Sequence, residues 1–253
     1  MNDTELKLLK APIIEAVLDV DCDMPPGFDL AKLEIPSRER FKETYPKFRK
    51  QLMQEHKIEA KLDKPPVTSV RHALQSLLFL NDSEKQIVQV RANGFSFNRL
   101  APYSSLNEYL PEIERTWKLF VSLASPVQIR AVRLRYINRI LLPMPEGRLE
   151  LEEFLKVGPR LPDEKQLTFT GFLNQHTAVE AGTGNKVSIV LTNQPMENKT
   201  LPIIFDITVE SNGVAEVENW TWLSGQIQAL RALKNLVFRN TLTDRCLNLF
   251  QQL

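Results

Sequence analysis

The stretch Val127–Pro143, VQIRAVRLRYINRILLP, decides the fold that we expect for this chain. Apolar and polar residues alternate along it, as they do in a strand that buries one face. Val132, Leu134 and Tyr136 share the face expected to be buried. The opposite face carries a row of arginines: Arg133, Arg135 and Arg139. Such a row can bind an anionic ligand, contact a nucleic-acid backbone, or pair with carboxylates on a neighbouring strand.

Residues 12–22, PIIEAVLDVDC, show the same alternation with acidic residues on the polar side. Ala16 and Leu18 fall on the face expected to be buried, and Glu15, Asp19 and Asp21 fall on the other. We expect this segment to be the first strand.

Between these two strands the pattern predicts a helix over residues 37–61, a strand over 67–80, a strand over 85–97 and a helix over 104–124. The first helix takes Ser37 as its N-cap and is kinked near Pro46. A change of alternation at Gly94 predicts a β-bulge in the strand over 85–97. The order strand, helix, strand, strand, helix, strand is that of a ferredoxin-like βαββαβ unit, in which the first and last strands are antiparallel neighbours. The row of arginines would then lie beside Glu15 and Asp19. We favour a cross-strand ion-pair ladder there, with a ligand clamp as the alternative.

The second half predicts a short helix over 147–159, strands over 167–181, 185–194 and 201–211, and a long helix over 217–250 with a break near 240–243. The fold class is therefore α+β, with antiparallel sheet and helices packed on one face. We expect a ferredoxin-like half over residues 1–145 and a β-meander with a C-terminal helix over 146–253. The two halves can share one sheet, because the junction between them is short.

Composition restricts the class of protein. The net charge of +1 gives no general attraction to nucleic acid or to an anionic membrane, so nucleic acid is not the favoured partner. Two distant cysteines, Cys22 and Cys246, do not form a disulfide framework. No signal peptide and no apolar run of the roughly 20 residues that span a membrane is expected, which favours a cytoplasmic protein.

No motif predicts a catalytic residue, a cofactor or a metal. Gly182-Thr-Gly-Asn connects two predicted strands, whereas a phosphate-binding loop precedes a helix. The histidines are not paired at ligand spacing, and His72 is expected in the core. Three aromatic residues are candidates for an interface: Tyr103, Trp220 and Trp222.

Three segments resemble an uncharacterised bacterial family of conserved hypothetical proteins: PIIEAV (12–17), GFSFNRLAPY (94–103) and RLRYINRI (133–140). The resemblance implies no activity or catalytic residue. The sporadic distribution of that family implies genes that move between genomes, such as phage-defence and toxin–antitoxin accessory genes.

The leading hypothesis is a non-enzymatic accessory or regulatory protein that binds another protein or a peptide. Its partner would be the product of an adjacent gene or a second copy of the chain. One alternative is an enzyme that acts on an anionic or phosphorylated substrate at an arginine and carboxylate site. Another is a protein that binds single-stranded nucleic acid.

Overall fold

The computed structural model describes residues 8–61, 64–144, 150–160, 166–167 and 170–251. Its strands are β1 (Ile13–Asp23), β2 (Lys47–Lys61), β3 (Lys64–Leu80), β4 (Gln86–Arg91), β5 (Gly94–Leu100), β6 (Gln128–Pro143), β7 (Leu173–Val179), β8 (Lys186–Asn193) and β9 (Thr200–Ala215). The helices are α1 (Glu34–Phe41), α2 (Leu106–Ala124), α3 (Trp220–Thr241) and α4 (Asp244–Asn248), with the 3-10 turns η1 (Leu30–Leu33) and η2 (Leu151–Glu153).

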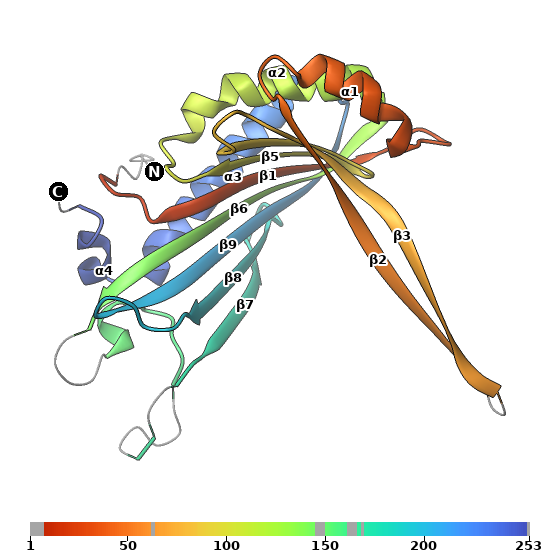
Figure 1. Ribbon diagram of the computed structural model, residues 1–253. Helices are drawn as coiled ribbons and strands as arrows, with labels where there is room; N and C mark the ends of the chain where they lie inside the picture. The colour runs from red at the N-terminus through yellow and green to blue at the C-terminus, as the bar shows by residue number, and fades with distance from the viewer. Residues whose placement is uncertain (1–7, 62–63, 145–149, 161–165, 168–169, 252–253) are drawn as a thin grey trace.

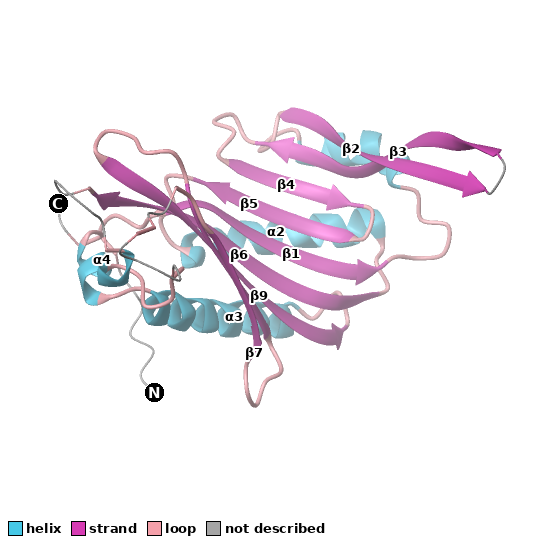
Figure 2. Ribbon diagram, turned by 90° about the horizontal axis from the view of Figure 1, so that it is seen from below, coloured by secondary structure: helices cyan, strands magenta, loops and turns pink. Residues whose placement is uncertain are grey.

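All nine strands form one antiparallel sheet in the order β2-β3-β4-β5-β1-β6-β9-β8-β7. Helices α2 and α3 cover one face of this sheet (Figure 1). The opposite face has no helix in front of β4, β5, β1 and β6 when it is viewed directly (Figure 2). We call this surface the open face. Hairpin β2–β3 projects beyond the other strands, away from the helices (Figure 1).

The core lies between the sheet and its helices. Trp117 of α2 packs edge-on against Phe95 of β5, with ring centroids 5.7 Å apart, and its indole Nε1 donates to the carbonyl of Val217. Phe238 of α3 stacks on Phe205 of β9 at 5.7 Å. These large side chains supply much of the buried apolar surface that holds the two layers together.

The predicted pairing of the first strand with the arginine strand is confirmed. β1 and β6 are antiparallel neighbours, with Asp19 opposite Arg133. The predicted meander is also present as β7, β8 and β9, and β9 pairs with β6, so one sheet runs through both halves of the chain. The boundary that we placed at residue 145 falls among residues 145–149, outside the described part. The predicted break in the long helix lies between α3 and α4.

The helix predicted over 37–61 is wrong. A helix forms only over Glu34–Phe41, so Ser37 lies inside it, and β2 begins at Lys47. Pro46 prevents the helix from continuing into the segment that follows, because it disfavours a helical conformation at the preceding residue, Tyr45. Phe41 then anchors the short helix by stacking on Phe79 of β3 at 4.8 Å. The segment after Pro46 gains a long antiparallel partner in β3.

The predicted β-bulge at Gly94 is also wrong, and with it the four-strand ferredoxin-like count for the first half. β4 and β5 are separate strands joined by a tight turn at Ala92 and Asn93. Gly94 follows the turn at a φ of +147°, and a Cβ atom there would lie 2.1 Å from the carbonyl oxygen of Val20. The turn makes the alternation change phase and adds one strand to the predicted count, β2 adds another, and the first half contributes six strands.

Candidate functional site

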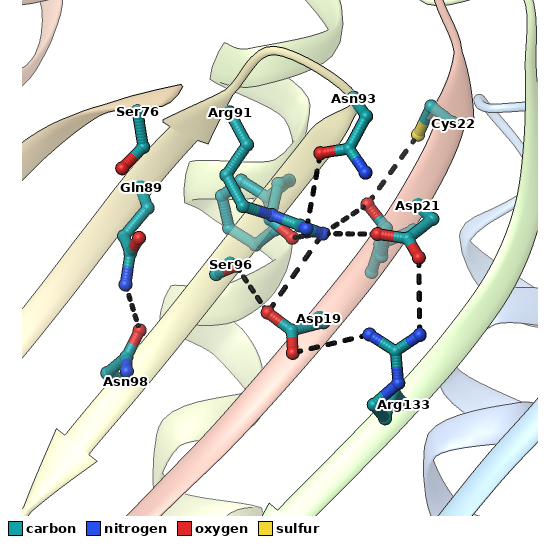
Figure 3. Close-up of polar contacts among 12 residues, drawn as sticks. Asp19, Asp21, Cys22, Ser76, Gln89, Arg91, Asn93, Ser96, Asn98 and Arg133 are labelled. Atoms are coloured by element: carbon teal, nitrogen blue, oxygen red, sulfur yellow. Dashed lines mark hydrogen bonds and ion pairs between the residues drawn. The ribbon is translucent and has the colours of Figure 1, made fainter. Parts of the chain in front are cut away.

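The centre of the open face is a network of paired charges around Arg133 of β6. Its Nε donates to Glu210 Oε2 of β9 at 2.9 Å. Its two terminal nitrogens lie 3.4 Å from Asp21 Oδ2 and 3.7 Å from Asp19 Oδ2, both in β1 (Figure 3). Burial alone would lower the pKa of Arg133, but these acids raise it above its ordinary value. One guanidinium thus connects three strands.

A second arginine, Arg91 of β4, approaches the same two aspartates from the other side (Figure 3). Its Nη2 donates to Asp21 Oδ1 at 2.6 Å and to the carbonyl of Phe95 at 3.1 Å. Asp19 also accepts a hydrogen bond from the hydroxyl of Ser96. The two aspartates therefore bridge Arg91 and Arg133, and their lone pairs are used within the face.

The other two arginines of the row are also paired. Arg135 holds Asp206 of β9 in a bidentate contact, with Nε 3.0 Å from Oδ1 and Nη2 2.6 Å from Oδ2. Arg139 donates to Gln194 at 3.0 Å and lies 2.6 Å from Glu197. The structure therefore places Arg133, Arg135 and Arg139 in a ladder of ion pairs whose acids come from β1, β9 and the β8–β9 connection.

Glu15 does not pair with the arginine row as expected. The β1–β6 register that pairs Asp19 with Arg133 continues without interruption to Glu15 and sets it opposite Ile137. Its Oε1 accepts instead from Asn98 of β5 at 2.8 Å, and Asn98 in turn accepts from Gln89 at 2.9 Å.

The charges of this face nearly cancel. Five basic residues (Arg91, Arg133, Arg135, Arg139 and Lys186) meet six acidic residues (Glu15, Asp19, Asp21, Asp206, Glu210 and Glu197). A surface that binds a phosphate backbone needs an excess of positive charge. The open face lacks that excess.

The two ends of the sheet differ in how they are protected. β2 begins with the exposed residues Lys47, Arg49 and Lys50, and charged side chains of this kind discourage a further strand from pairing. β7, LNQHTAV, ends the sheet and contains no Asp, Glu, Lys, Arg or Pro. Leu173 and Val179 at its two ends are 71% and 65% exposed.

A shallow hollow of about 320 Å³ lies on the open face next to β7. Its lining comes from β7, β8 and β9: Thr177, Ala178, Val179, Lys186, Val187, Ser188, Thr208 and Glu210. Glu210 accepts from Lys186 at 3.1 Å on one side and from Arg133 on the other. The hollow is therefore continuous with the ion-pair ladder.

The three aromatic residues predicted for an interface lie elsewhere. Tyr103 packs against the core on the helix side of the sheet, and its hydroxyl is 3.2 Å from that of Tyr136. Trp220 and Trp222 are half-buried against the core at the start of α3. A Cβ atom on Gly213 of β9 would meet the Trp222 ring at 2.7 Å, so this tryptophan lies close against the sheet.

The residues that the structure describes offer few other candidates for catalysis or metal binding. They contain no group of three or more His, Cys, Asp or Glu that could hold a metal ion. His72 is exposed, so its expected place in the core is wrong. Both cysteines are buried, and burial raises the pKa of Cys22 and Cys246 to about 12, which leaves them as unreactive thiols near neutral pH.

The comparisons with known proteins add no family. No protein-family model, curated protein or solved structure matches this chain. Within the described part of the chain, every helix is too short or too polar to cross a membrane. Any function must therefore be inferred from the geometry of this chain.

Sequence reasoning missed two polar residues on the helix side of the sheet. Lys234 of α3 is buried four residues after Leu230 and four before Phe238, on the apolar side of the helix. Asn138 of β6 falls on the buried side of the arginine strand, where its amide donates to the carbonyl of Phe205 at 2.9 Å. The signal was available, because each residue interrupts an otherwise apolar face.

Proposed function

We propose that this chain is a protein-binding module that takes up an extended segment of a partner protein along β7. The observation that supports this function best is the edge of β7, which pairs with no further strand among the described residues and lies beside the hollow on the open face. In strand addition, main-chain hydrogen bonds to an exposed edge give affinity, and recesses for alternate side chains give specificity. In this chain the edge of β7 and the hollow that could receive side chains are adjacent.

The contrast between the two edges supports this choice of strand. An exposed edge that carries apolar side chains and lacks charge or proline invites pairing with another strand. β7 has these properties, whereas the start of β2 has lysine and arginine. Leu173, Thr177 and Val179 share one side of β7, the side that borders the hollow.

Glu210 and Lys186 would recognise the side chains of the added segment. Burial would raise the pKa of Glu210, but hydrogen bonds from Lys186 and Arg133 lower it below its ordinary value, so the carboxylate stays ionised. Arg133 also holds Glu210 in place. A partner segment with mixed charge, carrying a basic or hydroxyl side chain over Glu210, fits this surface best.

The ion-pair ladder lends less support to the other hypotheses. An enzyme for an anionic substrate at the arginine row would need guanidinium groups that are free to bind it, and each arginine of the row already holds a carboxylate. The balanced charge of the open face also disfavours single-stranded nucleic acid.

The test is selection of a phage-displayed library of random peptides on the purified chain, followed by titration of the selected peptides. We expect bound peptide to slow amide hydrogen exchange across Leu173–Val179. The double substitution Leu173→Lys and Val179→Lys should weaken binding by about tenfold or more, since edge lysines oppose strand pairing. Leu236→Lys on α3, at a side chain that is 54% exposed, is the matched control and should leave binding unchanged.

Two outcomes would overturn this function. One is a set of peptides that bind the wild type and the double lysine variant equally, without protection of β7. The other is a dimer, detected by sedimentation and dissolved by the two lysines, which would assign the edge to a second copy of the chain.

A further inference from the structure

A cavity of about 540 Å³ lies on the helix side of the sheet, away from the open face. Its walls come from the segment before β1, the start of α2, strand β6 and helix α3. The lining residues that matter for its chemistry are Tyr103, Asn107, Tyr136, Asn138, Arg231 and Lys234. The volume falls within the range of about 300 to 1,000 Å³ that is typical of sites for small molecules.

Lys234 is the unusual member of this lining. Only 8% of the residue is exposed, although lysine is among the residues least often buried. Its Nζ lies 4.1 Å from the centroid of the Tyr136 ring. It forms no hydrogen bond or ion pair with any residue in the described ranges. A buried ammonium without a carboxylate is costly, and an anion in the cavity would supply the missing partner.

Further donors face the same space. The hydroxyls of Tyr103 and Tyr136 lie 3.2 Å apart, and burial raises the pKa of both, so they remain protonated and can donate. Arg231 donates to Oδ1 of Asn107, in the first turn of α2, at 2.8 Å. Among the described residues, Glu108 is the one acid in the lining, and its Oε2 accepts from the hydroxyl of Ser104 at 2.6 Å.

We propose that this cavity binds a small organic anion, whose carboxylate or phosphate group lies against the ammonium of Lys234 and the hydroxyls of Tyr103 and Tyr136. Charge-assisted hydrogen bonds of this kind are roughly twice as strong as neutral ones. Pro12 and Phe238 supply apolar walls for the body of the ligand. The site is independent of partner binding at β7.

Protonation of Lys234 should accompany binding. Burial, and secondarily the charge of Arg231, lowers the pKa of Lys234 to about 7. The titratable and charged groups that line the cavity with it are Arg231 from α3, Tyr136 from β6, Tyr103, and Glu108 from the first turn of α2. An anion beside the amine favours its charged form. Affinity should therefore be higher below pH 7 than above it.

Nuclear magnetic resonance with two aryl anions tests the site. The probes are 4-(trifluoromethyl)benzoate, followed by its fluorine signal, and phenyl phosphate, followed by its phosphorus signal. They distinguish a carboxylate site from a phosphate site. We expect at least one anion to bind, and the neutral 4-(trifluoromethyl)benzamide to bind about tenfold more weakly or not at all.

The decisive variant is Lys234→Met, which keeps the length of the side chain and removes its charge. It should weaken binding of the anion about tenfold and abolish the difference in affinity between pH 6 and pH 9. Lys118→Met, at an exposed lysine of α2, is the control and should change neither.

The proposal is overturned if neither anion binds the folded wild type at either pH. It is also overturned if Lys234→Met, folded as judged by circular dichroism, binds the anion with unchanged affinity and pH dependence. Neither result bears on the β7 edge, which is tested with peptides.

Discussion

Lys234→Met should change how the stability of the chain depends on pH. The ordinary pKa of a lysine, 10.5, applies in the unfolded chain, and the fold lowers the pKa of Lys234 to about 7. Between these values the unfolded chain binds a proton that the native state does not, so the free energy of unfolding rises with pH. Each pKa unit corresponds to about 1.4 kcal/mol. From pH 7 to pH 10 the free energy of unfolding of the wild type should therefore rise by about 4 kcal/mol more than that of the variant.

Urea unfolding at pH 7, 8, 9 and 10, followed by tryptophan fluorescence, measures this difference. The buffer should contain no carboxylate or phosphate, because an anion in the cavity would restore the pKa of Lys234. Groups that titrate in both proteins cancel when their slopes are compared, and Lys118→Met should follow the wild type because its side chain is exposed. Identical pH dependence in the wild type and in Lys234→Met would show that the ammonium is solvated in the native state, and the reasoning from burial would then be wrong.

Two further predictions concern the sheet. Gly94→Ala should lower the free energy of unfolding by about 3 kcal/mol or more in urea titrations, because its Cβ would lie 2.1 Å from the Val20 carbonyl oxygen. Gly182→Ala, in an open turn, is the control and should lower the free energy of unfolding by only about 1 kcal/mol. A double-mutant cycle of Arg133→Met and Glu210→Gln should give a coupling of about 1 kcal/mol near neutral pH. Since the fold lowers the pKa of Glu210, that coupling should be present above the ordinary value of 4.5 and disappear as the pH falls through the native pKa. A coupling that persists in acid would contradict the ion pair.

Alternation in the sequence was sufficient for the parts of the fold in which one face of a strand is buried. β1, β6, β8 and β9 follow their predicted segments because their buried sides are mainly apolar, with Asn138 of β6 and Ser211 of β9 as buried polar exceptions. The segment around β2 could not be predicted in this way. Phe41, Tyr45 and Phe48 fit helical spacing, yet Phe41 and Tyr45 are buried from a short helix and a turn while Phe48 packs on Phe79 from a strand. The choice was made by Pro46 and by a distant partner strand, β3.

The sequence predicted some features of the candidate sites and not others. The paired state of the arginine row followed from strand adjacency, but the partners depend on register. The register sets Glu15 opposite Ile137, so its carboxylate accepts from Asn98 instead of pairing with an arginine. The second neighbour of β6, which supplies Asp206 and Glu210, comes from the other half of the chain. The β7 edge depends on which strand ends the sheet, and local sequence does not specify that position.

Strand β6 separates the two proposed activities, because its side chains alternate between them. Arg133 and Arg135 face the open side, where each charge is neutralised by acids from neighbouring strands and the surface is preorganised for a polypeptide. Tyr136 and Asn138 face the helices and line the cavity that holds Lys234, whose charge has no carboxylate beside it within the described residues. The alternation of side chains along β6 thus gives one side on which the charges are paired and another that borders a buried cation without a carboxylate partner among the described residues. A ligand at the second site would stabilise the native state by an amount that rises with the logarithm of its concentration over its Kd, once that concentration exceeds the Kd. β6 lines the cavity and, through Arg133, also holds Glu210 of the hollow. Hydrogen exchange of its amides measured with anion, with peptide and with both would therefore show whether the two binding events are coupled; additive protection would mean that they are not.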